Sequence, residues 1–389
     1  MPETWVVAAK RTPIGKFGGA LKDVPAVELG AQAIRATVAQ AGIEGPEIDY
    51  AYMGIVVQAG VGQIPSRQAT IRAGLPVELP SDTINRVCAS SLRAVNLGDM
   101  SIRLGEAKVV LAGGMESMSQ APYLLYKARY GYRMGNGELV DSVVHDGLWC
   151  AFGDVHMGVH GGRVALEMGV SRQEMDEWSY RSQMRAKDAM ASGRLDDEIV
   201  PVQFGKAELA KDEGPRPDTT LERLQQLKPV FDPTHGITAG NAPALNDGGS
   251  AVLLMEASEA QRRGFKPLAR ILSHGAVSQE PAYLATVPAL SAQQALDRAG
   301  LKAKDLALVE INEAFAAVAI TSTKMLGVDP EIVNPNGGAV AFGHPIGASG
   351  ARILMTLIYE LRRRGGGYGV AAICSGGGQG EATVVRVDA

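Results

Sequence analysis

Cysteine is scarce in this chain of 389 residues, which contains only Cys88, Cys150 and Cys374. Such a sparse, odd number of cysteines does not suit a secreted disulfide framework, so we expect free thiols in a reducing compartment. Apolar runs are short, since the N-terminus does not resemble a signal peptide and no stretch approaches the length of a membrane-spanning helix. The sequence therefore predicts a cytoplasmic protein that has no membrane partner.

The chain also has no excess of basic side chains. It contains 38 Lys and Arg residues and 42 Asp and Glu residues, and its formal net charge is -4. This balance predicts no nucleic-acid partner. The glycine-rich dinucleotide pattern, the P-loop and the Gly-x-Ser-x-Gly pattern of serine hydrolases are absent, which disfavours those enzyme classes. His156 and His160 have the spacing of a metal pair, but no third ligand is evident, so no metal site is predicted.

Glycine is abundant, with 47 residues, and glycine turns recur in an internal repeat. The runs 48–54 and 306–312 each follow a helical stretch and an Ala-Gly pair. A second repeat links Cys88 and His344, because a small-residue turn, a helix and a strand ending in small residues follow each of them. Two similar halves in which helices alternate with short strands predict an α/β protein with mostly parallel sheets.

The pattern loosens between residues 119 and 249, which hold several tyrosines, a charged helix around 171–191 and a proline- and charge-rich stretch at 206–218. We interpret this segment as an insertion that covers an active site or forms an oligomer contact. The expected division of the chain is an N-terminal half of 1–118 and 250–270, an inserted loop domain of 119–249, and a C-terminal half of 271–389.

Cys88 lies where a short strand ends and small residues open a helix. A thiol at a helix N-terminus feels the positive end of the helix dipole, which lowers its pKa and favours the reactive thiolate. A lone cysteine is also commonly a buried structural residue, and the position by itself does not exclude that role.

Two further segments carry residues suited to acyl chemistry. Cys374 ends a strand and enters the glycine turn 376–378, whose backbone can approach a ligand and aim amides at an oxyanion. His344 is held in a rigid loop by neighbouring glycine and proline. Asn312 follows the strand 306–311 and could either cap the next helix or act in catalysis. Two cysteines and a histidine in corresponding turns of related halves predict a catalytic site.

These segments, in this order, resemble the motifs of the thiolase family, of the acetyl-CoA acetyltransferase type. The matching motifs cover essentially the whole chain and are Asn85-Arg86-Val87-Cys88-Ala89-Ser90, Gly113-Gly114-Met115-Glu116-Ser117-Met118-Ser119, His156-Met157-Gly158, Asn312-Glu313-Ala314-Phe315, Gly337-Gly338-Ala339, Gly343-His344-Pro345 and Cys374-Ser375-Gly376-Gly377-Gly378. The resemblance implies a thiolase-like, five-layered αβαβα body of two similar halves with an inserted loop domain.

The resemblance also implies a role for each catalytic residue. Cys88 matches the nucleophile that carries the acyl group as a thioester, and His344 matches the histidine that activates it. Cys374 matches the acid or base that moves a proton at the α-carbon of acetyl-CoA. Asn312 matches the asparagine that orders a water, which forms one oxyanion hole with His344. The amides of Cys88 and Gly376 match the second oxyanion hole.

The implied activity is a reversible Claisen condensation of two acetyl-CoA molecules to acetoacetyl-CoA and CoA, or thiolysis of a 3-ketoacyl-CoA. The implied protein is a homodimer or homotetramer without a cofactor, since coenzyme A is a substrate. Alternatives are a longer-chain 3-ketoacyl-CoA thiolase of β-oxidation, a decarboxylating ketoacyl synthase and a non-catalytic acyl-CoA-binding member of the fold. Cys374 and the Asn312 motif favour a thiolase over a synthase, and the complete catalytic set favours an enzyme.

Other matches concern substrate binding. Positions that match the pantetheine or acyl pocket are Leu148, His156, Met157, Phe231, Ala239, Leu284 and Phe315. Arg216 stands where the family places a basic residue near the nucleotide end of coenzyme A. The chain departs from the family pattern at Pro243, where serine is common, at Ser91, where glycine is usual, and at Gly161-Gly162-Arg163. These departures concern acyl-chain selectivity.

Overall fold

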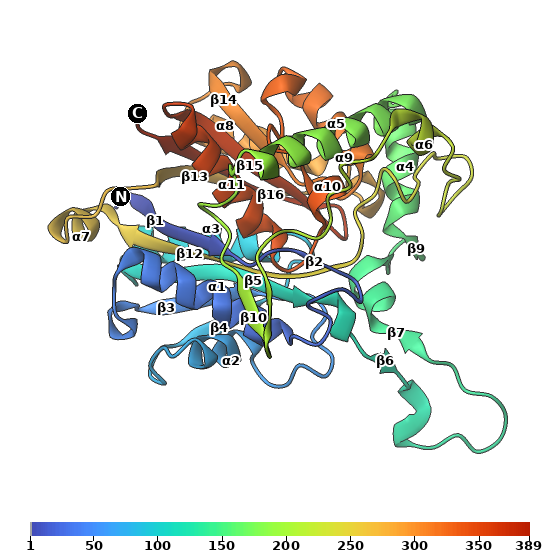
Figure 1. Cartoon of the computed structure of the whole chain (residues 1–389), viewed down its shortest axis with the longest axis horizontal. Coiled ribbons are helices and arrows are strands. Elements are labelled where there is room, and N and C mark those ends of the chain that lie inside the picture. Colours follow the sequence, from blue (N-terminus) through green and yellow to red (C-terminus); the bar gives the residue numbers. More distant parts are fainter. Residues whose placement is uncertain (1) are drawn as a thin grey trace.

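Two groups of strands with the same topology form the centre of the computed structural model, which describes residues 2–389 (Figure 1). The strands of the N-terminal half, in spatial order, are β4 (Ser81–Ile84), β3 (Tyr50–Gly54), β5 (Val109–Ser117), β12 (Asn246–Glu256) and β1 (Thr4–Arg11). Those of the C-terminal half follow as β13 (Ala269–Ser278), β16 (Gln379–Val387), β15 (Gly367–Ser375) and β14 (Leu306–Ile311). A short β2 (Gly15–Lys16) pairs with β12, and β1 pairs with β13, which joins the halves into one sheet.

The order and direction of the strands repeat between the halves. In each half a parallel pair, β3 with β5 or β14 with β15, is followed by two antiparallel neighbours. Val333 forms a parallel bridge to Val309 on β14 at the place that β4 occupies beside β3. The repeat found in the sequence therefore corresponds to a repeated topology.

The expectation of mostly parallel sheets was wrong, because antiparallel pairs dominate the sheet. The glycine turn after Ser375 is too short for a crossover, so β16 must return antiparallel to β15. In the other half β12 also returns antiparallel to β5, but after the whole inserted segment. Only the outer strands of each half keep the parallel arrangement.

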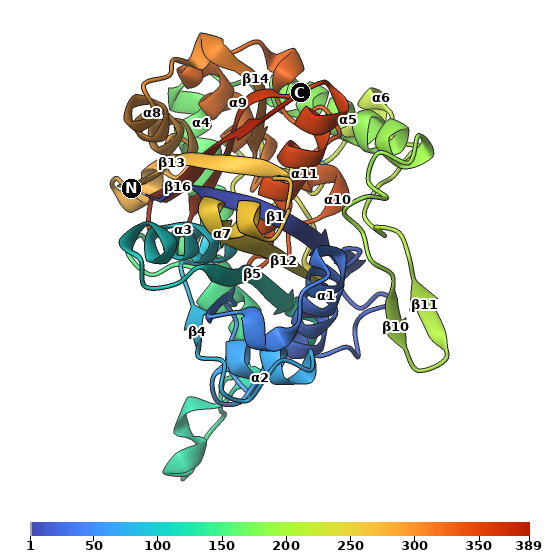
Figure 2. The ribbon, with the colours of Figure 1, turned by 90° about the vertical axis from the view of Figure 1, so that its left-hand side faces the viewer.

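Helices complete five layers, in the order that the family resemblance implied (Figure 2). The central layer consists of α3 (Ser90–Leu104) and α11 (Ser349–Arg363), which pack on each other and on strands of both halves. The outer layer of the N-terminal half holds α1 (Ala26–Ala41) and α2 (Pro65–Arg72), and that of the C-terminal half holds α8 (Val287–Ala299) and α9 (Ala316–Leu326). Residues 349–361 of α11 are buried, because sheets lie on both sides of it.

The segment between β5 and β12 covers one side of the C-terminal half. Its helices are α4 (Met157–Glu167), α5 (Arg172–Ala191) and α6 (Leu221–Gln225), and its short strand pairs are β6 (Tyr123–Leu124) with β7 (Val140–Asp141), β8 (Trp149–Cys150) with β9 (Val155–His156), and β10 (Val202–Phe204) with β11 (Ala207–Leu209). The predicted charged helix corresponds to α5, and both α4 and α5 pack on α9. The loop between β6 and β7 projects from the body as an arm (Figure 1).

Short helices α7 (Ala257–Arg262) and α10 (Ala339–Phe342) complete the chain. Across residues 2–389, no helix is both long enough and apolar enough to cross a bilayer.

Candidate active site

Cys88 follows a strained turn between β4 and α3. Val87 adopts a left-handed conformation with φ 43°, which is costly for a β-branched residue. The side chain of Asn85 accepts a hydrogen bond from the Val87 amide at 3.0 Å, and the Ser90 hydroxyl accepts one from the Arg86 amide at 2.8 Å. These contacts hold the turn and place Cys88 two residues before Ser90, the first residue of α3.

Cys374 lies at the end of β15, opposite the Cys88 turn. Gly377 and Gly378 follow with φ of 75° and 67°, so the tight return into β16 requires glycine. The Ser375 hydroxyl donates a hydrogen bond of 2.6 Å to the carbonyl of Arg86. This bond ties the two cysteine-bearing turns together, one from each half of the molecule.

His344 is held in one orientation by its neighbours. Its backbone amide donates to Asn246 Oδ1 at 2.9 Å, and its Nδ1 lies 2.6 Å from the hydroxyl of Ser349. Because that hydroxyl donates its own hydrogen to the carbonyl of Pro345 at 2.9 Å, Nδ1 must be the donor to Ser349. Nε2 is then left without a hydrogen and can act as a base. Asn312 Nδ2 lies 3.4 Å from it.

One cavity of about 510 Å³ is lined by Cys88, His344, Cys374 and Gly376. All seven residues assigned by resemblance to the pantetheine or acyl pocket line it too: Leu148, His156, Met157, Phe231, Ala239, Leu284 and Phe315. Most other lining residues are apolar, and those that the sequence analysis did not single out include Val144, Leu245 and Ile346. Asn312 does not line the cavity but lies next to His344, and its Oδ1 is buried without a hydrogen-bond partner among residues 2–389.

The expectation of a ready-made thiolate at Cys88 was wrong. Burial raises the pKa of its thiol to about 12, although the amides of Cys88 and Gly376 point at the sulfur and oppose this shift. Burial also raises the pKa of Cys374 well above its ordinary value, and the neighbouring Cys88 adds to that effect. Helix position alone indicated the opposite sign, because desolvation depends on packing that no local sequence pattern reveals.

His344 is the natural proton acceptor for this thiol. Burial, assisted by the nearby cation of Arg352, lowers the pKa of His344 to about 3, so its imidazole is neutral. The resting pair is therefore a neutral thiol and a neutral imidazole, and the proton must move when a substrate arrives.

Aromatic rings shape the part of the cavity next to α4. His156 stacks on Phe231 with ring centroids 4.0 Å apart, and Phe231 meets Phe315 edge-on at 6.3 Å. A Cβ atom at Gly158 would lie 2.1 Å from the Phe231 ring, so this glycine lets the ring lie directly on the helix. His156 and His160 belong to no group of three or more possible metal ligands within residues 2–389.

Arg216 does not line the cavity but a neighbouring hollow of about 460 Å³. The two spaces share Ala239, Ala242, Pro243 and Ala244, so together they form a longer path from the cysteines toward Arg216. A long substrate with an anionic end fits such a path.

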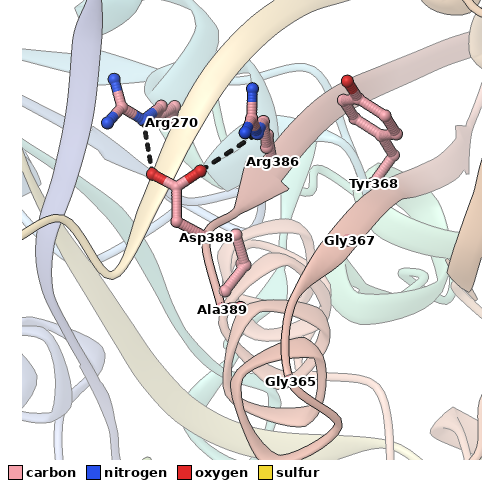
Figure 3. Close-up of a pocket in the computed structure, with 8 residues that line it drawn as sticks. Arg270, Gly365, Gly367, Tyr368, Arg386, Asp388 and Ala389 are labelled. Carbon is pink, nitrogen blue, oxygen red and sulfur yellow. Dashed lines mark hydrogen bonds and ion pairs between the residues drawn. The ribbon is translucent and has the colours of Figure 1, made fainter.

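A larger hollow of about 720 Å³ lies elsewhere, beside the C-terminal residues (Figure 3). Its two arginines, Arg270 and Arg386, are held by opposite oxygens of Asp388 at 2.9 and 3.0 Å. It contains no cysteine or histidine, so nucleophilic chemistry belongs to the smaller cavity.

Two residues near the cysteines were given no role from the sequence. Glu116 stood in a quoted motif, and its buried carboxylate accepts three backbone hydrogen bonds. Ser349 follows His344 by five residues, and a hydroxyl at that spacing beside a loop histidine is the signal that could have marked it.

Comparison with known proteins gives one consistent family. The family models described as "Thiolase, N-terminal domain" and "Thiolase, C-terminal domain" match residues 4–258 and 265–387. The chain is 47% identical to the acetyl-CoA acetyltransferase of Pseudomonas aeruginosa, with 100% of both chains covered. It is 45% identical to that of Cupriavidus necator, over 99% of this chain and 100% of the relative, and 44% identical to a probable acetyl-CoA acetyltransferase of Escherichia coli, with 100% of both covered.

Proposed function

Because the chain belongs to the thiolase family, we propose that it is an acyltransferase that condenses two acetyl-CoA molecules to acetoacetyl-CoA and CoA, or runs the reverse thiolysis. The observation that carries this proposal is the meeting of Cys88, His344 and Cys374 in one apolar cavity, which supplies a nucleophile, a base and a second thiol. The acetyl-CoA acetyltransferase names of the relatives support the choice of substrates.

In the first half-reaction, His344 Nε2 takes the thiol proton as the sulfur of Cys88 attacks the thioester carbonyl of acetyl-CoA. The amides of Cys88 and Gly376, which point at the sulfur, are placed to stabilise the oxyanion that forms next to it. His344 then gives this proton to the sulfur of coenzyme A, which leaves as a free thiol, and the acetyl group stays on Cys88 as a thioester. A thiol suits this reversible exchange because it is both a good nucleophile and a good leaving group.

In the second half-reaction, Cys374 passes its proton to His344 Nε2, and the resulting thiolate removes a proton from the α-carbon of the second acetyl-CoA. The enolate oxygen needs donors, and the imidazolium of His344 supplies one from Nε2. The unpartnered Oδ1 of Asn312 supports a role in orienting a water as the other donor. Each such donor typically contributes about 3 kcal/mol. The enolate carbon attacks the acetyl carbonyl on Cys88, acetoacetyl-CoA leaves, and His344 returns its proton to the Cys88 thiolate.

The pantetheine arm fits the apolar cavity, and Arg216 at the end of the joined path suits a phosphate or the adenine of coenzyme A. The second candidate is a longer-chain 3-ketoacyl-CoA thiolase, which the apolar lining and the lack of a hydroxyl at Pro243 favour. Relative kcat/KM across 3-ketoacyl-CoA substrates of increasing chain length separates the two candidates.

Self-association through the arm between β6 and β7 is part of the proposal. Its tip exposes large apolar side chains, including Tyr130 at 90% and Met134 at 98%, which a free monomer would leave in water. We expect a homotetramer in the cytoplasm, and removal of the arm should give a smaller species by light scattering. The three-part division at residues 118, 249 and 270 belongs to the same proposal, with the arm inside the inserted part.

Acetyl labelling tests the function directly. Incubation with acetyl-CoA should add one acetyl mass to the peptide that contains Cys88, and acetoacetyl-CoA with free CoA should be cleaved. Cys88→Ala should lose both signals. Absence of both signals from the unmodified chain would indicate a non-catalytic acyl-CoA-binding protein instead.

A further inference from the structure

Glu116, at the end of β5, joins two loops of the candidate active site through its carboxylate. The side chain is fully buried, with 0% exposure. Oε2 accepts hydrogen bonds from the amides of Val56 and Gly347, both at 3.0 Å, and Oε1 accepts one from Val57 at 3.2 Å. Val56 and Val57 belong to the loop after β3, whereas Gly347 belongs to the loop that carries His344.

The loop after β3 in turn contacts the turn that carries Cys88. The carbonyl of Val56 accepts a hydrogen bond of 3.2 Å from the side chain of Asn85, and the same side chain holds the amide of Val87. A continuous set of hydrogen bonds therefore runs from Glu116 to the residue before Cys88, while a second one runs to the His344 loop.

The His344 loop lies directly on β5 at this point. A Cβ atom at Gly347 would lie 2.6 Å from the carbonyl oxygen of Met115 and 2.8 Å from Glu116 Oε2. A Cβ atom at Gly114 would lie 2.0 Å from the carbonyl oxygen of Gly347. The two backbones meet without side chains between them, so the His344 loop is packed closely on the strand that carries Glu116.

The carboxylate also acts on the nucleophile through its charge. Burial raises the pKa of Glu116 to about 7, against the effect of its three amide donors, so the ionised form is well populated at neutral pH. Its negative charge contributes to the raised pKa of Cys88. The other groups around the Cys88–His344 pair are Cys374 on β15 and the cation of Arg352 on α11.

We propose that Glu116 is a positioning residue, which fixes His344 relative to Cys88 through its hydrogen bonds to Gly347 and Val56. This proposal rests on the proposed function, because it assigns Cys88 and His344 as nucleophile and base. The negative charge of Glu116 adds to burial in disfavouring the thiolate of Cys88, so loss of this charge should make the free thiol more reactive.

Glu116→Gln tests this proposal, since glutamine keeps the size but loses the charge and turns an NH₂ group toward backbone donors. We expect kcat for acetoacetyl-CoA thiolysis to fall about tenfold to hundredfold through misplacement of His344, with little change in KM for CoA. At the same time, alkylation of Cys88 by iodoacetamide at a fixed neutral pH should become faster by about twofold to tenfold. The Cys88 peptide is followed by mass spectrometry, so reaction at other thiols does not interfere.

Two further variants distinguish the effect of the Glu116 charge from the effect of the position of its carboxylate and from a general loss of structure. Glu116→Asp keeps the charge on a shorter side chain, so kcat should fall while Cys88 alkylation stays near the wild-type rate. Glu259→Gln is the control, because Glu259 is also buried but pairs with Arg262 and Arg263, and none of these residues lines the cavity. It should change neither kcat nor alkylation.

Wild-type kcat in Glu116→Gln would overturn the positioning role. Cys88 alkylation that is unchanged or slower in Glu116→Gln, or equally fast in Glu116→Asp, would overturn the effect of charge. Alkylation needs no turnover, so these outcomes are distinct from failure of the proposed function, which would show as absence of thiolysis and of acetyl labelling in the wild-type chain.

Discussion

At the scale of single residues, one hydroxyl decides which nitrogen of His344 can act as a base. Ser349 accepts from Nδ1 and donates to Pro345, which leaves Nε2 as the nitrogen without a hydrogen. Neutral histidine has two tautomers of similar energy in water, so a fixed partner for one nitrogen sets the role of the other.

Ser349→Ala should therefore lower kcat for thiolysis by about tenfold to hundredfold, because the ring loses both its orientation and its preferred tautomer. KM for CoA should change little, since Ser349 does not line the cavity. Ser349→Thr keeps the hydroxyl and should recover much of the rate. Equal loss in both variants would instead indicate a packing role for this position.

The two cysteines can be separated by a second substitution. Cys374→Ser replaces the thiol by a far weaker acid, so cleavage and formation of the carbon–carbon bond should collapse, on the scale of about 10²–10⁴ for an acid or base. Exchange of label between free CoA and acetyl-CoA needs the thiol of Cys88 but no proton transfer at carbon. This exchange should therefore survive in part. If exchange falls as far as thiolysis, Cys374 supports the geometry of Cys88 rather than the proton transfer.

The sequence motifs were sufficient to predict that Cys88, His344 and Cys374 meet in one cavity, but not what sets the pKa values of these residues. Cys88 illustrates the difference, because its local position indicated a lowered pKa and its burial raises it. Glu116 escaped notice because it contacts loops distant in sequence, whereas Ser349 lies only five residues after His344 and its spacing was not recognised. Arg216 was placed near the cavity rather than in it.

At the scale of elements, α4 forms one wall of the cavity through its glycines. Gly158 lets the Phe231 ring lie against the helix, where it stacks on His156. Gly161 and Gly162, where the chain departs from the family pattern, lie on the same helix. A Cβ atom at Gly161 would lie 2.8 Å from the ring of Phe315, so glycine also allows this ring to lie close to the helix. Glycine lowers the helix propensity of this segment but allows aromatic rings to approach the helix backbone closely.

Gly158→Ala should push the Phe231 ring away from α4 and break its stack on His156. We expect KM for CoA substrates to rise more than kcat falls, because a binding surface changes while the cysteines stay in place. Leu166→Ala, at an exposed position of the same helix, is the control and should alter neither parameter. A crystal structure of Gly158→Ala with an unmoved ring would contradict this account.

At the scale of the whole molecule, the repeat visible in the sequence corresponds to two halves of one topology around α3 and α11. The strands 306–311 and 109–112 were recognised from short apolar runs, and the helix after His344 from its apolar stripe. Strand direction was not recognised, because it depends on whether a hairpin or a crossover returns the chain. The arm between β6 and β7 has no periodic pattern at all.

Burial of the Glu116 carboxyl group at the candidate active site lowers the stability of the whole molecule at neutral pH. The pKa of Glu116 is raised to about 7 from the ordinary value of 4.5, so between these pH values the folded state binds more protons than the unfolded one. The contribution of Glu116 to stability is therefore present at low pH and is lost as pH rises through this window. Glutamine at position 116 does not titrate and should avoid that loss.

Glu116→Gln should accordingly gain stability relative to the wild-type chain as pH rises, by up to about 3 kcal/mol between pH 4.5 and 7. The measurement is the difference between their urea unfolding free energies across that range, which cancels the titration of shared groups that do not interact with position 116. Asp247, whose charge also raises the pKa of Glu116, contributes to the measured difference. A difference that stays constant with pH would show that Glu116 titrates normally. A gain in stability combined with slower thiolysis would show that the fold keeps an unfavourable charge because the reaction needs it.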